Sequence, residues 1–304
     1  MFIPAAMTTE VTLRAGAYEA VLVPSGAGLT SLTYEGKNLV RPHPPQRRAK
    51  GYSGKILLPW PNRITGAQYQ FDGSTYHLDA NDRATGSALH GLVHTRNWEV
   101  TQSSSDQVTF ATVVEPSDGY PFRLEATARY RLRPDAGLHL EVTTWNQSEK
   151  PAPFGIGAHP YLTCDGAPLD QCLLTVPASV FLEVNERLIP TGHHSVGGTL
   201  VDFRTERVVG DVALDHAFGD LPRTWSVTLA DPATQMAVRL DSDTRWVQLF
   251  SAEDFGRRCL AVEPMTCPPN AFNTGWDLIT LEPGGSNVFT LGIRRCFAQA
   301  KRLS

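Results

Sequence analysis

Residues 122–133 read FRLEATARYRLR, and apolar and polar side chains alternate along the whole stretch. An alternation with period two places every apolar side chain on one face, which is typical of a half-buried β-strand. After a turn at residues 134–137, a second alternating run begins at Leu138 and reaches Thr144. The two runs together predict a long antiparallel hairpin.

The rest of the chain repeats this pattern. Residues 108–114 alternate in the same way, and Asp72-Gly73 joins residues 69–71 to 74–76 as a two-residue hairpin turn. Further strands are predicted at 18–23, 28–34, 98–103, 172–176, 179–184, 224–229, 246–250 and 288–294. No window carries a helical stripe, and the extended stretches without a strand pattern are 41–54, 193–221 and 265–276. We therefore expect one all-β domain over residues 1–304, a large antiparallel β-sandwich.

Composition narrows the class of protein. With 304 residues, 41% of them hydrophobic, the chain is long enough to fold around a core without disulfides or a metal. A net charge of −4 speaks against a nucleic-acid or anionic-membrane partner. The five cysteines form no C-x-x-C pair, which is typical of free thiols in a reducing compartment. The first seven residues lack a basic, apolar leader pattern, and no apolar run approaches the ~18 residues of a membrane span. These features predict a cytoplasmic protein.

Two polar segments in the first third of the chain are candidates for a binding site. Residues 58–64 read LPWPNRI, so two prolines fix the backbone where the amide of Asn62 and the guanidinium of Arg63 project. These groups suit hydroxyl or carboxylate oxygens, although Arg63 could equally form a structural ion pair. His90 and His94 are spaced like ligands on a helix, but Gly91 and the β context argue against a helix there. We therefore expect no metal site, and His90 either binds substrate or packs.

Three later segments add acid–base groups. His159 precedes a proline, which restricts its backbone, and Glu263 closes an apolar strand, where an unpaired acid would be costly. Glu263 could also be a surface group at a strand end, and Asp215 could bind hydroxyls or cap a turn. A His and a Glu at separate strand ends can form an acid–base pair. The segments together suggest a pocket for a neutral, hydroxyl-rich ligand on a β scaffold, with no nucleophile elbow and no phosphate loop.

Taken in order, these segments resemble the aldose 1-epimerase (galactose mutarotase) family along nearly the whole chain. The motifs that carry the resemblance are GAGLTSL at 26–32, PNRI at 61–64, HG at 90–91, HPY at 159–161, IPTG at 189–192, LDH at 214–216, EP at 263–264 and LEPG at 281–284. The sequence departs from galactose mutarotases proper after Glu263 and at Leu162, so it is more similar to the broad bacterial branch of the family.

The resemblance implies a supersandwich with an open sugar-binding cleft, no cofactor and a monosaccharide substrate, in a monomer or homodimer. It implies that Glu263 is the general base and His159 the general acid. It further implies substrate binding by Asn62, Arg63, His90, Tyr161, Asp215 and Gln248. A Glu near pKa 4.3 is ionised at neutral pH, and a neighbouring carboxylate is expected to keep His159 protonated.

The expected activity is the interconversion of the α and β anomers of an aldohexose by acid–base ring opening and closure. One alternative is a hexose-6-phosphate 1-epimerase, for which Arg47, Arg48 and Lys50 form the nearest basic cluster. The other alternative is a non-catalytic sugar-binding or sensor module, which would not need both Glu263 and His159.

Overall fold

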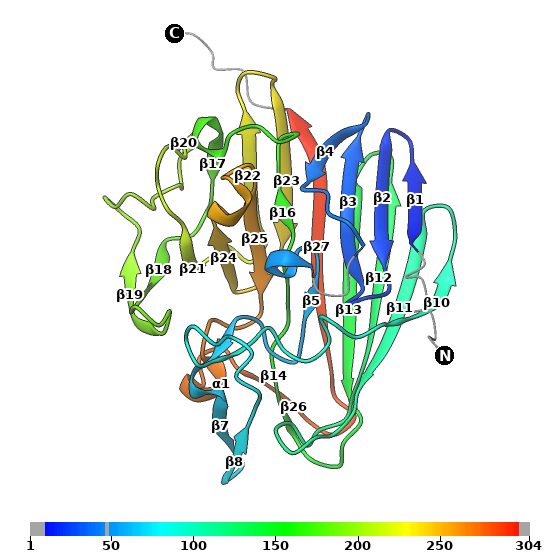
Figure 1. The fold of residues 1–304 in the computed structure, drawn as a ribbon, viewed down its shortest axis with the longest axis vertical. Coiled ribbons are helices and arrows are strands. Elements are labelled where there is room, and N and C mark those ends of the chain that lie inside the picture. The colour runs from blue at the N-terminus through cyan, green and yellow to red at the C-terminus, as the bar shows by residue number, and fades with distance from the viewer. Residues whose placement is uncertain (1–9, 46–48, 298–304) are drawn as a thin grey trace, which may run out of the picture.

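The computed structural model describes residues 10–45 and 49–297, and shows two large β-sheets packed face to face (Figure 1). The expectations for the first seven residues and for Arg47 and Arg48 concern residues outside this description. Neighbouring strands run antiparallel in both sheets. The predicted fold class, an all-β antiparallel sandwich, is confirmed.

The first sheet has twelve strands and carries the segments with candidate site residues. Its spatial order is β1 (Val11–Ala15), β2 (Tyr18–Val23), β3 (Gly28–Tyr34), β4 (Lys37–Val40), β16 (Tyr161–Leu162), β25 (Leu260–Met265), β24 (Trp246–Phe250), β21 (Asp215–Gly219), β18 (Val180–Val184) and β19 (Pro190–Ser195), with β15 (Gly157–Ala158) joining β25 to β5 (Ile56–Leu57).

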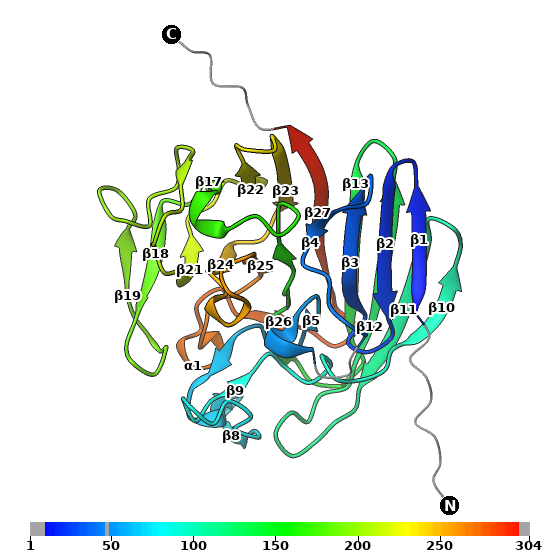
Figure 2. The same cartoon turned by 45° about the horizontal axis from the view of Figure 1, so that its top comes forward.

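The second sheet has nine strands and contains the long hairpin predicted between residues 122 and 144. Its spatial order is β10 (Glu99–Ser103), β11 (Gln107–Val114), β12 (Leu124–Arg133), β13 (Gly137–Asn146), β27 (Ser286–Phe297), β23 (Met236–Ser242), β22 (Trp225–Asp231), β17 (Leu173–Thr175) and β20 (Arg207–Val208). Figures 1 and 2 both show β1–β3 lying over β11–β13.

Short ribbons and a few helical turns complete the described chain. The ribbons are β6 (Arg63–Ile64) with β9 (Ala88–Leu89), β7 (Gln68–Phe71) with β8 (Ser74–His77), and β14 (Ala152–Phe154) with β26 (Ile279–Leu281). The helical turns are α1 (Ala271–Thr274) and 3₁₀ turns at Lys50–Tyr52, Thr65–Ala67, Leu169–Gln171 and Glu253–Phe255. No helix among the described residues is long and apolar enough to cross a membrane.

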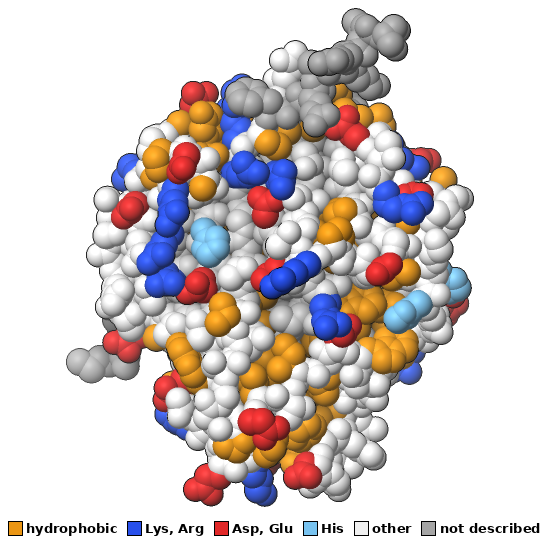
Figure 3. All heavy atoms as spheres, turned by 180° about the vertical axis from the view of Figure 1, so that it is seen from behind, with side chains coloured by type: hydrophobic (Ala, Val, Ile, Leu, Met, Phe, Trp, Pro, Cys, Tyr) orange, Lys and Arg blue, Asp and Glu red, His pale blue; other side chains and the backbone are white. Residues whose placement is uncertain are grey.

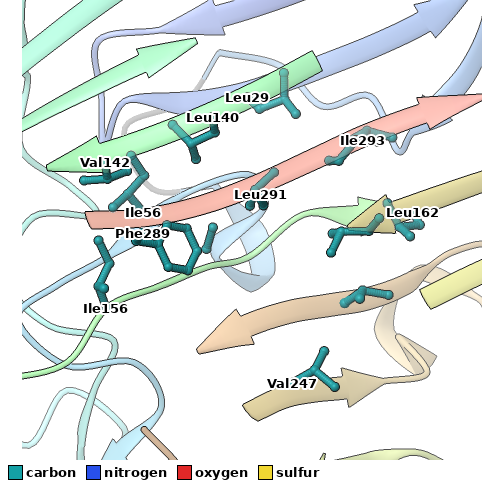
Figure 4. Close-up of a cluster of buried hydrophobic side chains, with 14 of the residues drawn as sticks. Leu29, Ile56, Leu140, Val142, Ile156, Leu162, Val247, Phe289, Leu291 and Ile293 are labelled. Atoms are coloured by element: carbon teal, nitrogen blue, oxygen red, sulfur yellow. The ribbon is translucent and has the colours of Figure 1, made fainter. Parts of the chain in front are cut away.

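Alternation places the core between the two sheets. In β12, Leu124, Ala126, Ala128, Tyr130 and Leu132 are buried, while the residues between them are more exposed. Figure 4 shows how apolar side chains of both sheets meet, with Phe289, Leu291 and Ile293 of β27 in the middle. The Tyr130 hydroxyl crosses this core and donates to the Ala27 carbonyl at 2.8 Å, so even the polar end of a core tyrosine is paired.

Most predicted strands are present within a few residues, but one stretch was predicted wrongly. Residues 193–221 were expected to contain no strand, yet half of β19 and all of β20 and β21 lie there. The reason is that β19 is an edge strand with mostly exposed, polar side chains, PTGHHS, so it lacks an alternation of apolar residues. The predicted Asp72-Gly73 hairpin is confirmed, and both turn residues have positive φ.

Candidate active site

His159 and Glu263 meet because of the register of three short strands. Gly157 pairs with Met265 and Tyr161 pairs with Ala261, so His159 falls opposite Glu263 between the two pairings. Pro160 has no N–H and interrupts the ladder at this point. The side chains lie on the same face, with His159 Nε2 3.2 Å from Glu263 Oε1. Segments about 100 residues apart therefore bring the predicted acid and base into direct contact.

Burial determines the protonation of this pair. His159 is 5% exposed and Glu263 is 3% exposed. Burial lowers the pKa of His159 to about 3. Burial, followed by the nearby charge of Asp215, raises the pKa of Glu263 well above its usual range. The expectation of an ionised Glu263 that keeps His159 protonated is therefore wrong for this site, because desolvation outweighs the attraction between the two groups. Both shifts favour the uncharged forms, a protonated Glu263 and a neutral His159.

Asp215 and Gln248 extend the site across the next strands of the sheet. Gln248 on β24 pairs in register with Glu263, and its Nε2 donates to Asp215 Oδ1 on β21 at 2.7 Å. Burial raises the pKa of Asp215, with Arg63 opposing that shift. Gln248 Oε1 and Glu263 Oε2 are buried without a hydrogen-bond partner among the described residues. Buried polar atoms without partners mark a place where a ligand can bind.

Asn62, Arg63 and His90 lie at one end of the β6–β9 ribbon. Asn62 and His90 both have positive φ, and their backbones join through His90 N–H donating to the Asn62 carbonyl at 2.9 Å. The Asn62 N–H donates to His90 Nδ1 at 3.2 Å. Burial lowers the pKa of His90 well below its ordinary value. A neutral ring that accepts at Nδ1 carries its proton on Nε2, so His90 is a hydrogen-bond donor.

Arg63 is held by an acid that the sequence analysis did not identify. Its Nε lies 2.9 Å from Asp82 Oδ2, and Thr85 donates to the same oxygen at 2.7 Å. The guanidinium is also near enough to lower the pKa of both Asp215 and Glu263. Arg63 therefore makes the ion pair considered from sequence and faces the site at the same time. Asp82 follows a polar loop with no distinguishing motif, so nothing in the sequence pointed to it.

Two tyrosines pack around the His159 ring. Tyr161 stacks on it with ring centroids 5.0 Å apart and donates its hydroxyl to the Gly51 carbonyl at 3.0 Å. The Tyr161 hydroxyl thus already donates a hydrogen bond within the protein, and the residue is only 2% exposed. Its contact with the site is therefore the stacking of its ring on His159. Tyr52 contacts the rings of His90, His94 and His159, and sequence reasoning missed it. A cavity of about 770 Å³ lies on the Tyr52 side of the site.

The site also contains a set of atoms that could ligate a metal. One donor atom each from His90, His159 and Glu263 lies within 4.8 Å of the others, and all three residues are buried. Two histidines and a carboxylate are a known zinc ligand set. His90 and His94, the pair weighed from the sequence, do not supply it together. The direct contact of His159 with Glu263 gives this set a second use, proton exchange.

An antiparallel β-sandwich with a buried His–Glu contact among polar side chains is the arrangement that an acid–base enzyme on a β scaffold would need. A family model described as aldose 1-epimerase matches residues 9–294. The chain is 40% identical over 274 residues to the Escherichia coli K12 protein named uncharacterized protein YihR, covering 90% of this chain and 89% of that one. It is 30% identical over 235 residues to maltose epimerase of Levilactobacillus brevis, covering 68% of each.

Solved structures agree on the fold. A GalM/aldose epimerase homologue from C. elegans superposes with a TM-score of 0.87 at 21% identity, covering 96% of this chain and all of that chain. Galactose 1-epimerase from Lactobacillus acidophilus NCFM gives a TM-score of 0.82 at 20% identity, covering 95% of each. The chain belongs to the aldose 1-epimerase family and is an isomerase acting on carbohydrates.

Proposed function

We propose that the protein interconverts the α and β anomers of an aldohexose, with Glu263 as general base and His159 as general acid. The observation that carries the proposal is the 3.2 Å contact between the buried His159 Nε2 and Glu263 Oε1, in surroundings whose burial favours the form in which Glu263 holds the proton. Moving that proton from Glu263 to His159 creates a carboxylate base and an imidazolium acid without changing the net charge of the site. Positioned proton transfer of this kind contributes about 10²–10⁴-fold in rate.

The reaction then needs two proton movements. Glu263 takes the proton of the anomeric hydroxyl while His159 gives its proton to the ring oxygen, so the C1–O5 bond breaks and a free aldehyde forms. Rotation about C1–C2 presents the other face of the aldehyde, and the reverse transfers close the ring as the other anomer. Every atom of the sugar is conserved and no oxidant is consumed.

The remaining groups supply hydrogen bonds to the sugar. Arg63, oriented by Asp82, and His90, a donor at Nε2, are placed to bind oxygen atoms on which negative charge develops. Asp215, Gln248 and Asn62 are placed to bind hydroxyls, and Tyr161 holds the His159 ring. Galactose mutarotases of mammals are 30–33% identical over 161 residues, half of this chain, which supports a free aldohexose as substrate.

The test is polarimetry on freshly dissolved α-D-glucose, α-D-galactose and α-maltose, corrected for the spontaneous rate. Glu263→Gln is expected to lower the catalysed rate at least about 10²-fold. Glu183→Gln is the matched control, because Glu183 contacts His194 at 3.1 Å in an exposed pair of the same type. The control variant is expected to keep the wild-type rate.

Three further measurements distinguish this proposal from a metal site, a phosphorylated substrate and a non-catalytic binding module. Removal of divalent ions with EDTA is expected to leave the rate unchanged; a loss that zinc restores would assign the His90–His159–Glu263 set to a metal. A rate on glucose 6-phosphate far above that on glucose would favour a phosphorylated substrate, although Lys50 already contacts Asp254. Sugar binding without catalysis by the wild-type protein would show a binding module and contradict the proposal.

A further inference from the structure

The outer face of the nine-stranded sheet contains a hollow of about 600 Å³ that the proposed reaction does not use. Gly292 of β27 leaves part of its floor without a side chain, and Gly137 of the neighbouring β13 also lines the hollow. Gly292 lies in register between His139 and Asp241. Figure 3 views the molecule from behind and shows basic side chains and a histidine around a shallow hollow on that face.

The catalytic pair lies on the other side of the sandwich. Val262 and Val247, which neighbour Glu263 and Gln248 along their strands, are buried in the core between the sheets. Side chains alternate along a strand, so Glu263 and Gln248 project away from that core. The nine-stranded sheet and its core therefore separate the hollow from the active site.

Four arginines line the hollow, and three of them are fixed through Nε alone. Arg239 Nε lies 2.6 Å from Asp241 Oδ1, and Arg294 Nε lies 3.4 Å from Asp241 Oδ2. Arg131 Nε donates to Gln107 Oε1 at 2.6 Å. The terminal Nη atoms of these arginines have no hydrogen bond within residues 10–45 and 49–297. Their guanidinium groups are therefore oriented in advance, with donors left for another molecule.

Arg133 completes the group from the edge of the hollow. Its guanidinium makes no hydrogen bond or ion pair with any described residue. Three aspartates also line the hollow, but two of them are engaged: Asp241 lies between two arginines, and Asp243 accepts from Thr290 at 3.1 Å. The third, Asp135, is exposed. The lining thus has one more arginine than aspartate, in a chain whose net charge is −4.

We propose that this hollow binds a small oxyanion, a phosphoryl or carboxylate group, either free or carried by a hydroxyl-rich metabolite. Guanidinium groups bind such groups with two parallel hydrogen bonds, and pre-oriented ones lose little side-chain entropy on binding. Hydroxyls of Thr224, Ser226 and Thr290 line the same hollow and suit the hydroxyl-bearing part of a larger ligand. The site is a second binding site, independent of the sugar-isomerising one.

The test is isothermal titration calorimetry of the full chain with inorganic phosphate, glucose 6-phosphate and glucose. Gly292→Val adds a side chain to the floor of the hollow, where a Cβ would have only Leu138 O at 3.8 Å and Asp241 Cβ at 4.0 Å as neighbours. Arg133→Gln removes one donor group and disturbs no partner. Arg123→Gln is the matched control: it makes the same charge change directly before the start of β12, but Arg123 contacts Glu115 and lies outside the hollow.

Wild-type protein and Arg123→Gln are expected to bind phosphate at millimolar concentration or below. Arg133→Gln and Gly292→Val are expected to weaken binding about tenfold or more, and added salt to weaken it further. Binding of glucose 6-phosphate alone, weakened by the same two variants, would also support the proposal and assign an organic oxyanion. No binding, or binding that both variants leave unchanged, would overturn it. Mutarotation of glucose by both variants is expected to stay at the wild-type rate, so the two proposals fail separately.

Discussion

At the scale of single residues, the site depends on how burial redistributes one proton. An exposed Glu–His contact, such as that of Glu183 with His194 at the surface, keeps the hydration that stabilises charged side chains. In the buried pair, desolvation disfavours both charged forms, so Glu263 keeps the proton that an ion pair would place on His159. A sugar that supplies new hydrogen bonds replaces part of the lost hydration and favours the charged, reactive form.

A proton held by Glu263 rather than by His159 predicts an unusual dependence of the catalysed rate on pH. The active pair holds one proton, and activity is lost when it gains a second or gives up its only one. Burial lowers the pKa of His159 to about 3, so the second proton is added well below the ordinary histidine value. Burial raises the pKa of Glu263, so the single proton is retained well above the ordinary carboxyl value. We therefore expect kcat/KM, measured by polarimetry, to be nearly the same at about pH 5 as at about pH 7.

The control for this measurement is Glu263→Gln at each pH, because free acid and base also catalyse mutarotation and must be subtracted. If the pair instead titrated as an exposed ion pair, with a carboxyl near 4.3 and a histidine near 6.5, it would give up its only proton above about pH 6.5, and kcat/KM would be about threefold higher at pH 5 than at pH 7. Such a rise toward pH 5 would contradict the effect of burial on this pair.

At the scale of elements, very short strands and left-handed turns place the site. β15 and β16 have two residues each, and so do β6 and β9, yet their registers bring His159 opposite Glu263 and Asn62 against His90. Asn62 and His90 both have positive φ, which is uncommon outside glycine and is concentrated at functional sites. Gly91 follows His90 in the same conformation and lets the turn approach Leu58 closely.

The Gly91 turn gives a prediction about both stability and activity. Gly91 has φ +70°, and a Cβ there would lie 2.2 Å from the Leu58 carbonyl oxygen. Gly36 has φ +75° with nothing within 4 Å, so Gly36→Ala reports the conformational strain alone, about 1 kcal/mol. Gly91→Ala is expected to lower the free energy of unfolding by about 2–4 kcal/mol and also to lower the polarimetric rate, because His90 must move. If urea unfolding showed that Gly91→Ala and Gly36→Ala lower the free energy of unfolding equally, the close approach of Gly91 to Leu58 would have no effect on stability and the prediction would be wrong.

How far the sequence predicted these elements depended on their length and burial. β12 and β13 were predicted because ten-residue strands buried on one face show a long alternation. β15 and β16 are too short to show a period, and β19 is too exposed. The motifs predicted which side chains gather at the site, but not the direction of the pKa shifts of His159 and Glu263. Burial depends on the segments packed around a residue, and these come from distant parts of the chain.

At the scale of the whole molecule, the two sheets form one structure because they share one core. Its apolar side chains extend from Leu13 in the first sheet to Ile293 in the second. The twelve-stranded sheet itself combines β1–β4 from the start of the chain with β16, β18, β19, β21, β24 and β25 from its second half. No segment of the described chain thus forms its part of the core alone, and the single domain expected over residues 1–304 stays a prediction.

A single domain predicts one cooperative unfolding transition in urea. Far-UV circular dichroism reports both sheets, and tryptophan fluorescence reports Trp225 in the second sheet and Trp246 in the first, so the two curves are expected to coincide. Phe289→Ala removes a buried side chain from the middle of the shared core and is expected to cost about 3–5 kcal/mol. Both curves should shift together by that amount. Val288→Ala, which changes an exposed neighbour on the same strand, should shift neither appreciably. Two separated transitions, or a shift in only one probe, would show that the sheets unfold independently and that the chain contains two domains.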